Sequence, residues 1–247
     1  MRIDINCDVG EGMVNETLLM SYISSCNIAS GGHFGTRKTI DKTIQLAIEN
    51  DVLIGAHPSF PDKENFGRKV MNISKRELYK SIQNQLDLFL ERLDHFNQKL
   101  HHIKPHGALY NLIAIDEVAA KNFVAAIQKY MQDVFLYVPY NSKIEEVAIQ
   151  NDINIQYEAF GDRNYTEDLK LVSRKHKNAI LTNPKEVYNH IYKMVVEGSV
   201  KTLQGNEKEM KADTFCIHGD NQKAQEILAF LTTEFSKFCS FFNFYIF

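Results

Sequence analysis

Short apolar runs alternate with longer amphipathic segments along the chain, and this alternation constrains the fold more than any other feature. The runs have the length and β-branched content of strands, whereas the segments between them space apolar residues as helices do. A strand–helix order repeated this often predicts a parallel sheet, open or closed into a barrel. The predicted strands are Arg2–Asp8, Cys26–Gly31, Val52–His57, His101–His106, Val134–Val138, Ile153–Glu158, Ala179–Leu181 and Thr214–His218.

Three helix starts can be located from capping residues. Ser74 and Glu77 form a capping box ahead of a long amphipathic segment. Asn183 followed by Pro184 is a typical helix start. Asp220 can cap the last helix of the chain.

We expect a single domain over residues 1–247, because no linker rich in Pro, Gly or Ser interrupts the chain. Hydrophobic residues make up 44% and charged residues 24%, an ordinary balance for a globular protein. The polar segment 198–213 is expected to be an insertion, with a small hairpin, before the last strand. The aromatic tail, 238–247, is expected to pack on the barrel; an exposed tail would instead be a docking surface for a partner.

Several classes of function are not expected. The net charge of -3 and the lack of basic runs give no reason to expect nucleic acid. No apolar stretch has the length of a signal peptide core or a membrane span, and the four cysteines are scattered, so a cytoplasmic location is expected. Neither a P-loop nor a strand-linked G-x-G-x-x-G motif is present.

Six predicted strands end in motifs rich in Asp, Glu, His, Lys or Gly. In parallel α/β folds the carboxyl ends of strands form the active-site face, so these residues are expected to meet. Asp8 and Glu11, beside glycines, are paired carboxylates suited to metal binding or acid–base work. His33 lies among three glycines, and His57 ends an apolar strand. Arg68 could bind a carboxylate or phosphate, and a surface ion pair is equally compatible with its position.

The fourth motif carries two cationic candidates, Lys104 and His106, which could stabilise oxyanion charge or bind a phosphoryl group. His218, in the last motif, repeats the order of histidine then glycine. Five other histidines are expected to lie at the surface without a functional role: His95, His101, His102, His176 and His190.

The remaining candidates have structural alternatives. Glu158, Asp162 and Arg163 lie at or after the end of one predicted strand, where a structural salt bridge involving Arg163 is an alternative to substrate binding. Asp220 is either a substrate contact or the N-cap already described.

Taken in order, these motifs resemble the LamB/YcsF family over nearly the whole chain. The resemblance implies a TIM-like (β/α) barrel, of the irregular seven-stranded type shared with glycoside hydrolases and deacetylases. It also implies ATP-dependent ring opening of 5-oxo-L-proline to L-glutamate, with two partner subunits that resemble allophanate hydrolase halves. The number of copies that assemble is left open, and a homo-oligomer is one alternative. The motifs are D-V-G-E-G at 8–12, N-I-A-S-G-G-H at 27–33, G-A-H-P-S-F-P-D at 55–62, F-G-R at 66–68, K-P-H-G-A-L-Y-N at 104–111, F-G-D-R-N-Y at 160–165 and C-I-H-G-D at 216–220.

Four positions depart from the family pattern. Ser30 replaces a usual cysteine, Gly161 a usual alanine and Lys69 a usual arginine. Thr36 replaces an aspartate that commonly closes the histidine loop, and therefore removes one carboxylate from this region.

Activating a stable lactam with ATP would make its carbonyl carbon electrophilic, and this chemistry assigns hypothetical roles. The catalytic candidates are Asp8, Glu11, Lys104, His106 and Glu158. The candidates for substrate binding are His33, His57, Arg68, Asp162, Arg163, His218 and Asp220.

A divalent metal, Mg²⁺ or Zn²⁺, is a further expectation. Asp8, His33 and His57 follow three successive strands, and one carboxylate with two imidazoles suits such an ion. Two other functions stay open: a metal-dependent deacetylase or amidohydrolase acting alone, and a non-catalytic subunit that binds the substrate.

Overall fold

The computed structural model describes residues 2–242, 245 and 246, and the side chains of residues 3–237. Within that range the chain has the predicted TIM-like barrel, with seven parallel strands ringed by eight helices. The strand order is β1-β2-β3-β4-β5-β6-β9, and β9 also pairs with β1. The barrel strands are β1 (Arg2–Val9), β2 (Ser25–Ala29), β3 (Leu53–His57), β4 (His102–Ile103), β5 (Phe135–Pro139), β6 (Ile155–Phe160) and β9 (Thr214–Cys216).

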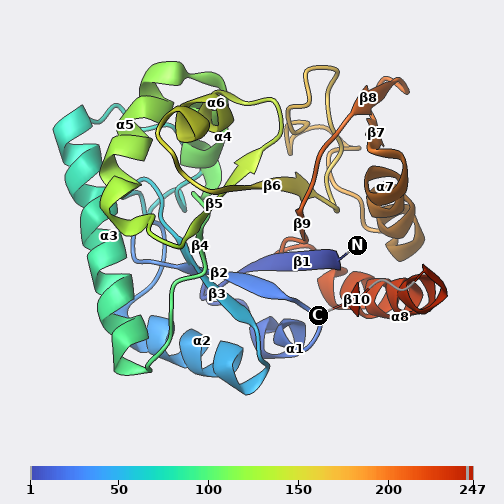
Figure 1. Cartoon of the computed structure of the whole chain (residues 1–247), viewed down its shortest axis with the longest axis horizontal. Helices are drawn as coiled ribbons and strands as arrows, with labels where there is room; N and C mark the ends of the chain where they lie inside the picture. Colours follow the sequence, from blue (N-terminus) through green and yellow to red (C-terminus); the bar gives the residue numbers. More distant parts are fainter. Residues whose placement is uncertain (1, 243–244, 247) are drawn as a thin grey trace. The chain divides into compact units, whose positions relative to one another are not determined.

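Helices follow most of these strands (Figure 1). A 3-10 turn, Gln128–Tyr130, extends the fifth helix, and a short strand β10 (Tyr245–Ile246) pairs with the start of β1. The helices are α1 (Glu16–Met20), α2 (Arg37–Glu49), α3 (Lys75–His95), α4 (Gly107–Ile115), α5 (Glu117–Ile127), α6 (Lys143–Gln150), α7 (Pro184–Glu197) and α8 (Ala224–Phe242).

The chain forms two compact units. We name residues 8–13 and 26–156 the first unit, and residues 2–7, 14–25, 157–242, 245 and 246 the second unit. The expectation of a single domain over residues 1–247 stays a prediction.

The first unit contains most of the sheet and five helices. β4 runs parallel to β3 and β5, with His102 opposite Gly55 on one side and Phe135 on the other. Helix α3 lies beside α2 and α5 (Figure 1). The predicted capping box is confirmed, since Ser74 Oγ accepts from the Glu77 N–H and Glu77 accepts from the Ser74 N–H. The buried face of α3 consists of Leu78, Ile82, Gln85, Leu86, Phe89 and Leu93.

The second unit contains α7 and α8, which pack against each other (Figure 1). Asn183 caps α7 by accepting from the backbone N–H groups of the first turn, and Pro184 opens the helix, as predicted. The expected hairpin within 198–213 is confirmed: β7 (Ser199–Lys201) and β8 (Glu207–Glu209) are antiparallel. The side chains of the aromatic tail, 238–247, lie outside those described.

The predicted strand Ala179–Leu181 is wrong. Within this described segment, Ile180 makes only an isolated antiparallel bridge with Arg163. The N–H of Leu181 donates to the Asp162 carbonyl, and the Arg163 guanidinium donates to the Ala179 carbonyl. Because these backbone groups are satisfied by the loop after β6, the segment does not join the sheet.

The predicted cap at Asp220 is also wrong. Helix α8 begins at Ala224, four positions further on. Asp220 instead forms an ion pair with Arg174, whose Nη1 lies 3.0 Å from Asp220 Oδ2. A capping geometry is found next to it, where Asn221 Oδ1 accepts from the N–H of Lys223.

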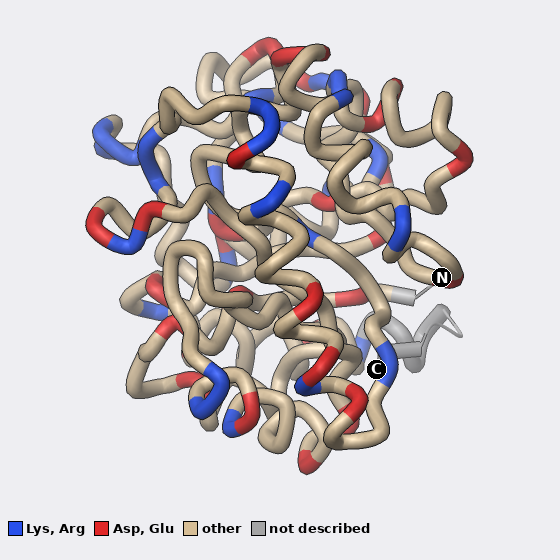
Figure 2. The backbone as a smooth tube through the Cα atoms, turned by 90° about the vertical axis from the view of Figure 1, so that its left-hand side faces the viewer, with Lys and Arg blue, Asp and Glu red and all other residues tan. Residues whose placement is uncertain are grey.

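Charged residues of both signs are interspersed along the described chain (Figure 2). This pattern agrees with the small net charge of -3 and shows no run of one sign. Among the described helices, none combines the length and apolar character needed to cross a lipid bilayer.

Candidate active site

Six predicted side chains from the ends of four strands converge in the first unit. Asp8 lies near the end of β1 and Glu11 in the turn after it, while His33 follows β2. All six side chains are largely buried, which strengthens every charge interaction among them. His57 ends β3, and Lys104 and His106 lie in the segment after β4.

Asp8 is the centre of a buried ion pair. Its Oδ1 accepts hydrogen bonds from Lys104 Nζ at 2.8 Å and from Asn27 Nδ2 at 2.9 Å. Its Oδ2 lies 3.4 Å from His57 Nε2. Lys104 is only 2% exposed, so its ammonium is buried against this carboxylate.

Glu11 is surrounded by histidine rings. His33 Nε2 lies 2.9 Å from Glu11 Oε1, and His106 Nδ1 lies 3.4 Å from the same oxygen. The rings of His33 and His106 stack with centroids 3.7 Å apart. Burial and the neighbouring His57 lower the pKa of His33 to about 3, and the same causes lower the pKa of His106, so both rings are neutral near pH 7.

Backbone carbonyls orient two of these histidines. His57 Nδ1 lies 2.7 Å from the Lys104 carbonyl oxygen, and His106 Nε2 lies 3.0 Å from the Phe66 carbonyl oxygen. The loop that supplies the second carbonyl turns at Gly67, whose φ is +62°. A Cβ there would lie 3.0 Å from both His33 Cβ and His106 Cδ2, so only glycine allows this close approach.

His102 is a site residue that the sequence analysis missed. It was expected at the surface, but it is fully buried, and its Nε2 lies 2.7 Å from Asn27 Oδ1. Asn27 in turn donates to Asp8, so His102 fixes the orientation of the Asn27 amide. The signal was present: His102, Lys104 and His106 alternate with the period of two that places side chains on one face of a strand.

The other four histidines were also predicted to lie at the surface, and this prediction is confirmed for two of them. His95 and His176 are exposed, as expected, and His101 is half-buried. His190 is half-buried as well, and its Nε2 is buried with no hydrogen-bond partner among the described residues.

Arg68 lies at the exposed margin of the first-unit cluster. Its guanidinium carbon lies 5.1 Å from the centre of the Phe66 ring, and that ring meets His33 edge-on at 5.1 Å. An exposed guanidinium stacked on an aromatic ring is suited to bind an anionic group by a bidentate contact.

The donor atoms of the first unit fit a metal ion, but in groupings that differ from the predicted one. Ligand atoms of Asp8, His57 and His106 lie within 4.8 Å of one another, as do those of Glu11, His33 and His106. The predicted set of Asp8, His33 and His57 draws on both groups.

The second unit contains a separate histidine–carboxylate pair. His218 Nδ1 lies 2.8 Å from Asp162 Oδ1, and Asn221 Nδ2 donates to Asp162 Oδ2 at 3.0 Å. Burial opposes ionisation of Asp162, but the nearby His218 and these hydrogen bonds lower its pKa below the usual value. Such an orienting carboxylate is what a histidine needs for general acid–base work.

The other residues predicted for the site, Arg163, Glu158 and Asp162, lie in different surroundings within the second unit. Arg163 donates to the carbonyls of Ala179 and Val172, at 3.2 and 2.6 Å, which is a structural role. Glu158 lies within β6, two residues before its end, and is 2% exposed. Asp162 pairs with His218 in place of the salt bridge with Arg163 that was the alternative.

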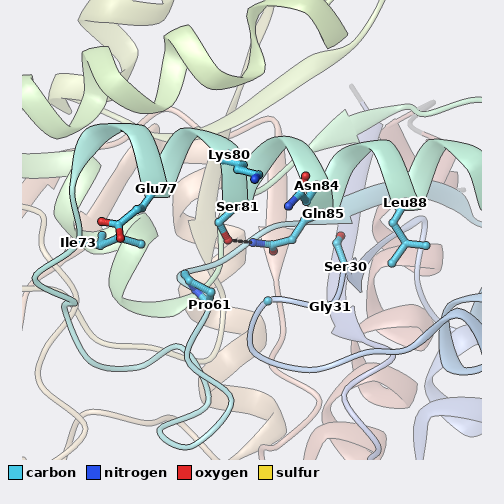
Figure 3. A pocket seen from close by; sticks show the side chains of 11 residues that line it. Ser30, Gly31, Pro61, Ile73, Glu77, Lys80, Ser81, Asn84, Gln85 and Leu88 are labelled. Atoms are coloured by element: carbon cyan, nitrogen blue, oxygen red, sulfur yellow. Dashed lines mark hydrogen bonds between the residues drawn. The ribbon is translucent and has the colours of Figure 1, made fainter.

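Gln85 of α3 supports the loop behind His57. Its Oε1 accepts from the Ser59 N–H at 3.0 Å, and its Nε2 donates to the Ser59 carbonyl at 2.9 Å and to Ser81 Oγ at 3.2 Å. It also lines a surface hollow of about 440 Å³, whose walls are α3, Pro61 and the loop at Ser30–Gly32 (Figure 3). A polar residue on the otherwise apolar buried face of α3 was the sequence signal for this support.

The structure explains two departures from the family pattern. Thr36 is the N-cap of α2, and its hydroxyl accepts from the Thr39 N–H. Aspartate and threonine both serve as N-caps, so this position is accounted for by helix capping. Ser30 Oγ accepts from the His57 N–H at 3.1 Å and donates to the Ile28 carbonyl at 3.0 Å.

Sequence comparison places this chain among known proteins. The model of the LamB/YcsF family matches residues 3–239. The chain belongs to the LamB/YcsF family. Among its relatives, a protein from Pyrococcus horikoshii that is named as a subunit of 5-oxoprolinase is 35% identical, over 94% of this chain and 92% of the relative.

Two further proteins match this chain over nearly its whole length. A 5-oxoprolinase subunit from Staphylococcus haemolyticus is 36% identical, covering 96% of this chain and 97% of the relative. The crystal structure of a lactam utilization protein from Thermus thermophilus superimposes with a TM-score of 0.91 at 31% identity, covering 100% and 99% of the two chains.

Proposed function

We propose that this chain is the lactam-processing component of an ATP-dependent 5-oxoprolinase, which converts 5-oxo-L-proline to L-glutamate together with partner subunits. The names of its relatives support both the substrate class and the existence of partners. The observation that carries the proposal is the buried cluster at the strand ends, in which two carboxylates meet three histidines and a lysine.

The chemistry needs activation because a lactam is a stable amide. Attack of the lactam oxygen on the γ-phosphate of ATP would release ADP and leave C5 electrophilic. Addition of water at C5 and cleavage of the C–N bond would then give an acyl phosphate, which a second water converts to glutamate and phosphate. This sequence requires a base for water, a cationic group for the oxyanion and a proton for the departing nitrogen.

Residues of the first unit match the first two requirements. Glu11, adjacent to the neutral rings of His33 and His106, is suited to accept a proton from water. Arg68 is the best placed cation for a substrate carboxylate or a phosphate, since the Lys104 ammonium is bonded to Asp8. A divalent ion bound by Asp8 and the histidines would supply Lewis-acid polarisation of the substrate oxygen.

The second unit contains a histidine suited to proton transfer. His218 is oriented by Asp162 through Nδ1, an arrangement typical of general acid–base catalysis. Glu158 stays a candidate base in this unit.

An assay of glutamate release from 5-oxoproline tests the proposal. The chain is assayed alone, with ATP, and with ATP plus purified subunits that resemble allophanate hydrolase halves. We expect glutamate and ADP in the complete mixture, and a fall of about 100-fold or more for Glu11→Gln. The matched control is Glu49→Gln, at an exposed position of α2. A complete mixture that forms no ATP-dependent glutamate refutes the proposal.

One observation favours a second candidate, a metal-dependent amidohydrolase or deacetylase that acts alone. The grouping of Asp8, His57 and His106 provides two imidazoles and a carboxylate, as metal-dependent hydrolysis would need. Metal-dependent release of acetate from an N-acetylated substrate, without ATP or partners, would identify this activity.

A third candidate is a subunit that only binds the substrate. In that case His106→Ala would weaken the binding of 5-oxoproline but leave turnover at saturating substrate unchanged.

A further inference from the structure

The rings of His57 and His106 face each other through their nitrogen atoms. His57 Nε2 lies 2.9 Å from His106 Nδ1, a distance at which two nitrogens ordinarily share a hydrogen. Two carboxylate oxygens lie around the same point: Asp8 Oδ2 is 3.4 Å from His57 Nε2, and Glu11 Oε1 is 3.4 Å from His106 Nδ1. Four potential ligand atoms from three loops therefore converge.

In each ring the nitrogen that points away from the other ring donates to a backbone carbonyl. A carbonyl oxygen can only accept, so His57 Nδ1 carries its hydrogen toward the Lys104 carbonyl, and His106 Nε2 carries its hydrogen toward the Phe66 carbonyl. The nitrogens that face each other, His57 Nε2 and His106 Nδ1, are then the ones left to bind a ligand. Histidines whose outer N–H donates to a backbone carbonyl are typical of metal sites, because that bond fixes the tautomer and ring orientation.

The donor atoms at this point match the ligands of a divalent cation. Ligand atoms of Asp8, His57 and His106 lie within 4.8 Å of one another, and they combine two imidazoles with a carboxylate.

His33 lies beside Glu11 in this cluster. Its Nε2 is directed to Glu11 Oε1 at 2.9 Å, and its ring stacks on His106. It therefore orients Glu11 and supports the ring of His106.

We propose that Asp8, His57 and His106 bind one divalent transition-metal ion, with Glu11 as a fourth ligand and His33 as the residue that positions Glu11. Two imidazoles with carboxylates favour Zn²⁺, Mn²⁺ or Co²⁺ over Ca²⁺ or Mg²⁺, which prefer oxygen ligands. The inference goes beyond the proposed function, because metal binding is measurable without any substrate.

The test measures metal uptake by the full-length chain after treatment with EDTA. Zn²⁺ or Mn²⁺ is added, unbound ion is removed, and the metal content is determined by mass spectrometry, with affinity from calorimetry. We expect one ion per chain, a higher Tm with metal, and affinity lowered by about 100-fold or more in His57→Asn and His106→Asn. The control is His95→Asn, which removes an exposed imidazole of α3.

Two results overturn the proposal. One is a wild-type chain that takes up no ion above background. The other is uptake that persists in His57→Asn and His106→Asn, which would place the ion elsewhere.

A measurement on the wild-type chain tests the same ligands even where the variants fail to fold. Zn²⁺ should shift the ring ¹⁵N signals of His57 and His106 and leave those of His95 and His176 in place. Shifts confined to other histidines contradict the proposed ligands. Since none of these measurements uses 5-oxoproline or ATP, a failure here is distinct from a failure of the proposed function.

Discussion

The ammonium of Lys104 lies 2.8 Å from Asp8 Oδ1, inside a unit where Lys104 is 2% exposed. Replacing the lysine by Lys104→Met would keep the aliphatic volume and remove the charge. We expect the free energy of unfolding to fall by about 3 kcal/mol, because the Asp8 carboxylate would stay buried without its ammonium. Urea denaturation followed by circular dichroism measures this loss.

The matched control is Lys129→Met. Lys129 makes an exposed ion pair with Asp87 at 3.2 Å, and exposed pairs contribute little. Equal losses of stability in the two variants would show that the Lys104–Asp8 pair does not stabilise the fold.

Gly55 tests whether His102 matters for the site. A Cβ added at Gly55 would lie 2.1 Å from His102 Nε2, the atom that contacts Asn27. Gly55→Ala should therefore displace the His102 ring, cost about 1–3 kcal/mol of stability, and lower glutamate release although no charged residue is changed. Thermal unfolding and the reconstituted assay measure the two effects.

Gly161→Ala is the matched control in the second unit. The new Cβ would lie 2.6 Å from Ile191 Cδ1, the movable end of a side chain. We expect a smaller loss of stability than for Gly55→Ala. A Gly55→Ala enzyme with full activity would mean that the His102–Asn27 contact has no part in catalysis.

The barrel and the first-unit cluster could be predicted because both depend on local pattern and topology. Apolar runs followed by polar residues identify strand ends, and parallel strands bring those ends together. This reasoning was sufficient to associate Asp8, His33, His57, Lys104 and His106 from the sequence alone.

What could not be predicted depends on contacts between distant positions. His218 and Asp162 are 56 residues apart, and the loops between them set their pairing. Ala179–Leu181 has the composition of a short strand, but the loop after β6 satisfies its backbone. The metal ligands that we propose likewise depend on which ring nitrogen meets a carbonyl, and a sequence pattern does not contain this information.

His190 gives the stability a defined pH dependence. Burial lowers its pKa to about 4, below the value of about 6.5 expected in the unfolded chain. Between these values the unfolded state binds the proton and the folded state does not. The free energy of unfolding is therefore not reduced by His190 above about pH 6.5. It falls as the pH is lowered from there toward 4, by up to about 1.4 kcal/mol per pH unit.

Urea unfolding between pH 4 and 7 in EDTA measures that slope. His33, with its pKa lowered to about 3, contributes in the same direction, so His190→Phe should reduce the slope without abolishing it. The control is His95→Phe, at an exposed position of α3. A slope identical in wild type and His190→Phe would contradict the prediction.

Asp162 and His218 define the last prediction. The carboxylate fixes the tautomer of His218 by accepting from Nδ1, so Asp162→Asn should preserve the shape of the pair and disturb the proton position. If His218 transfers a proton during turnover, kcat for glutamate release should fall by about 100-fold or more in His218→Asn and Asp162→Asn. KM for 5-oxoproline should change little, since these variants affect proton transfer.

The split between kcat and KM separates a role in proton transfer from a role in substrate binding. His176→Asn, an exposed histidine of the same unit, is the control. Variants that raise KM and keep the kcat of the wild type would assign the pair to substrate binding, because a binding residue changes affinity without changing turnover at saturating substrate.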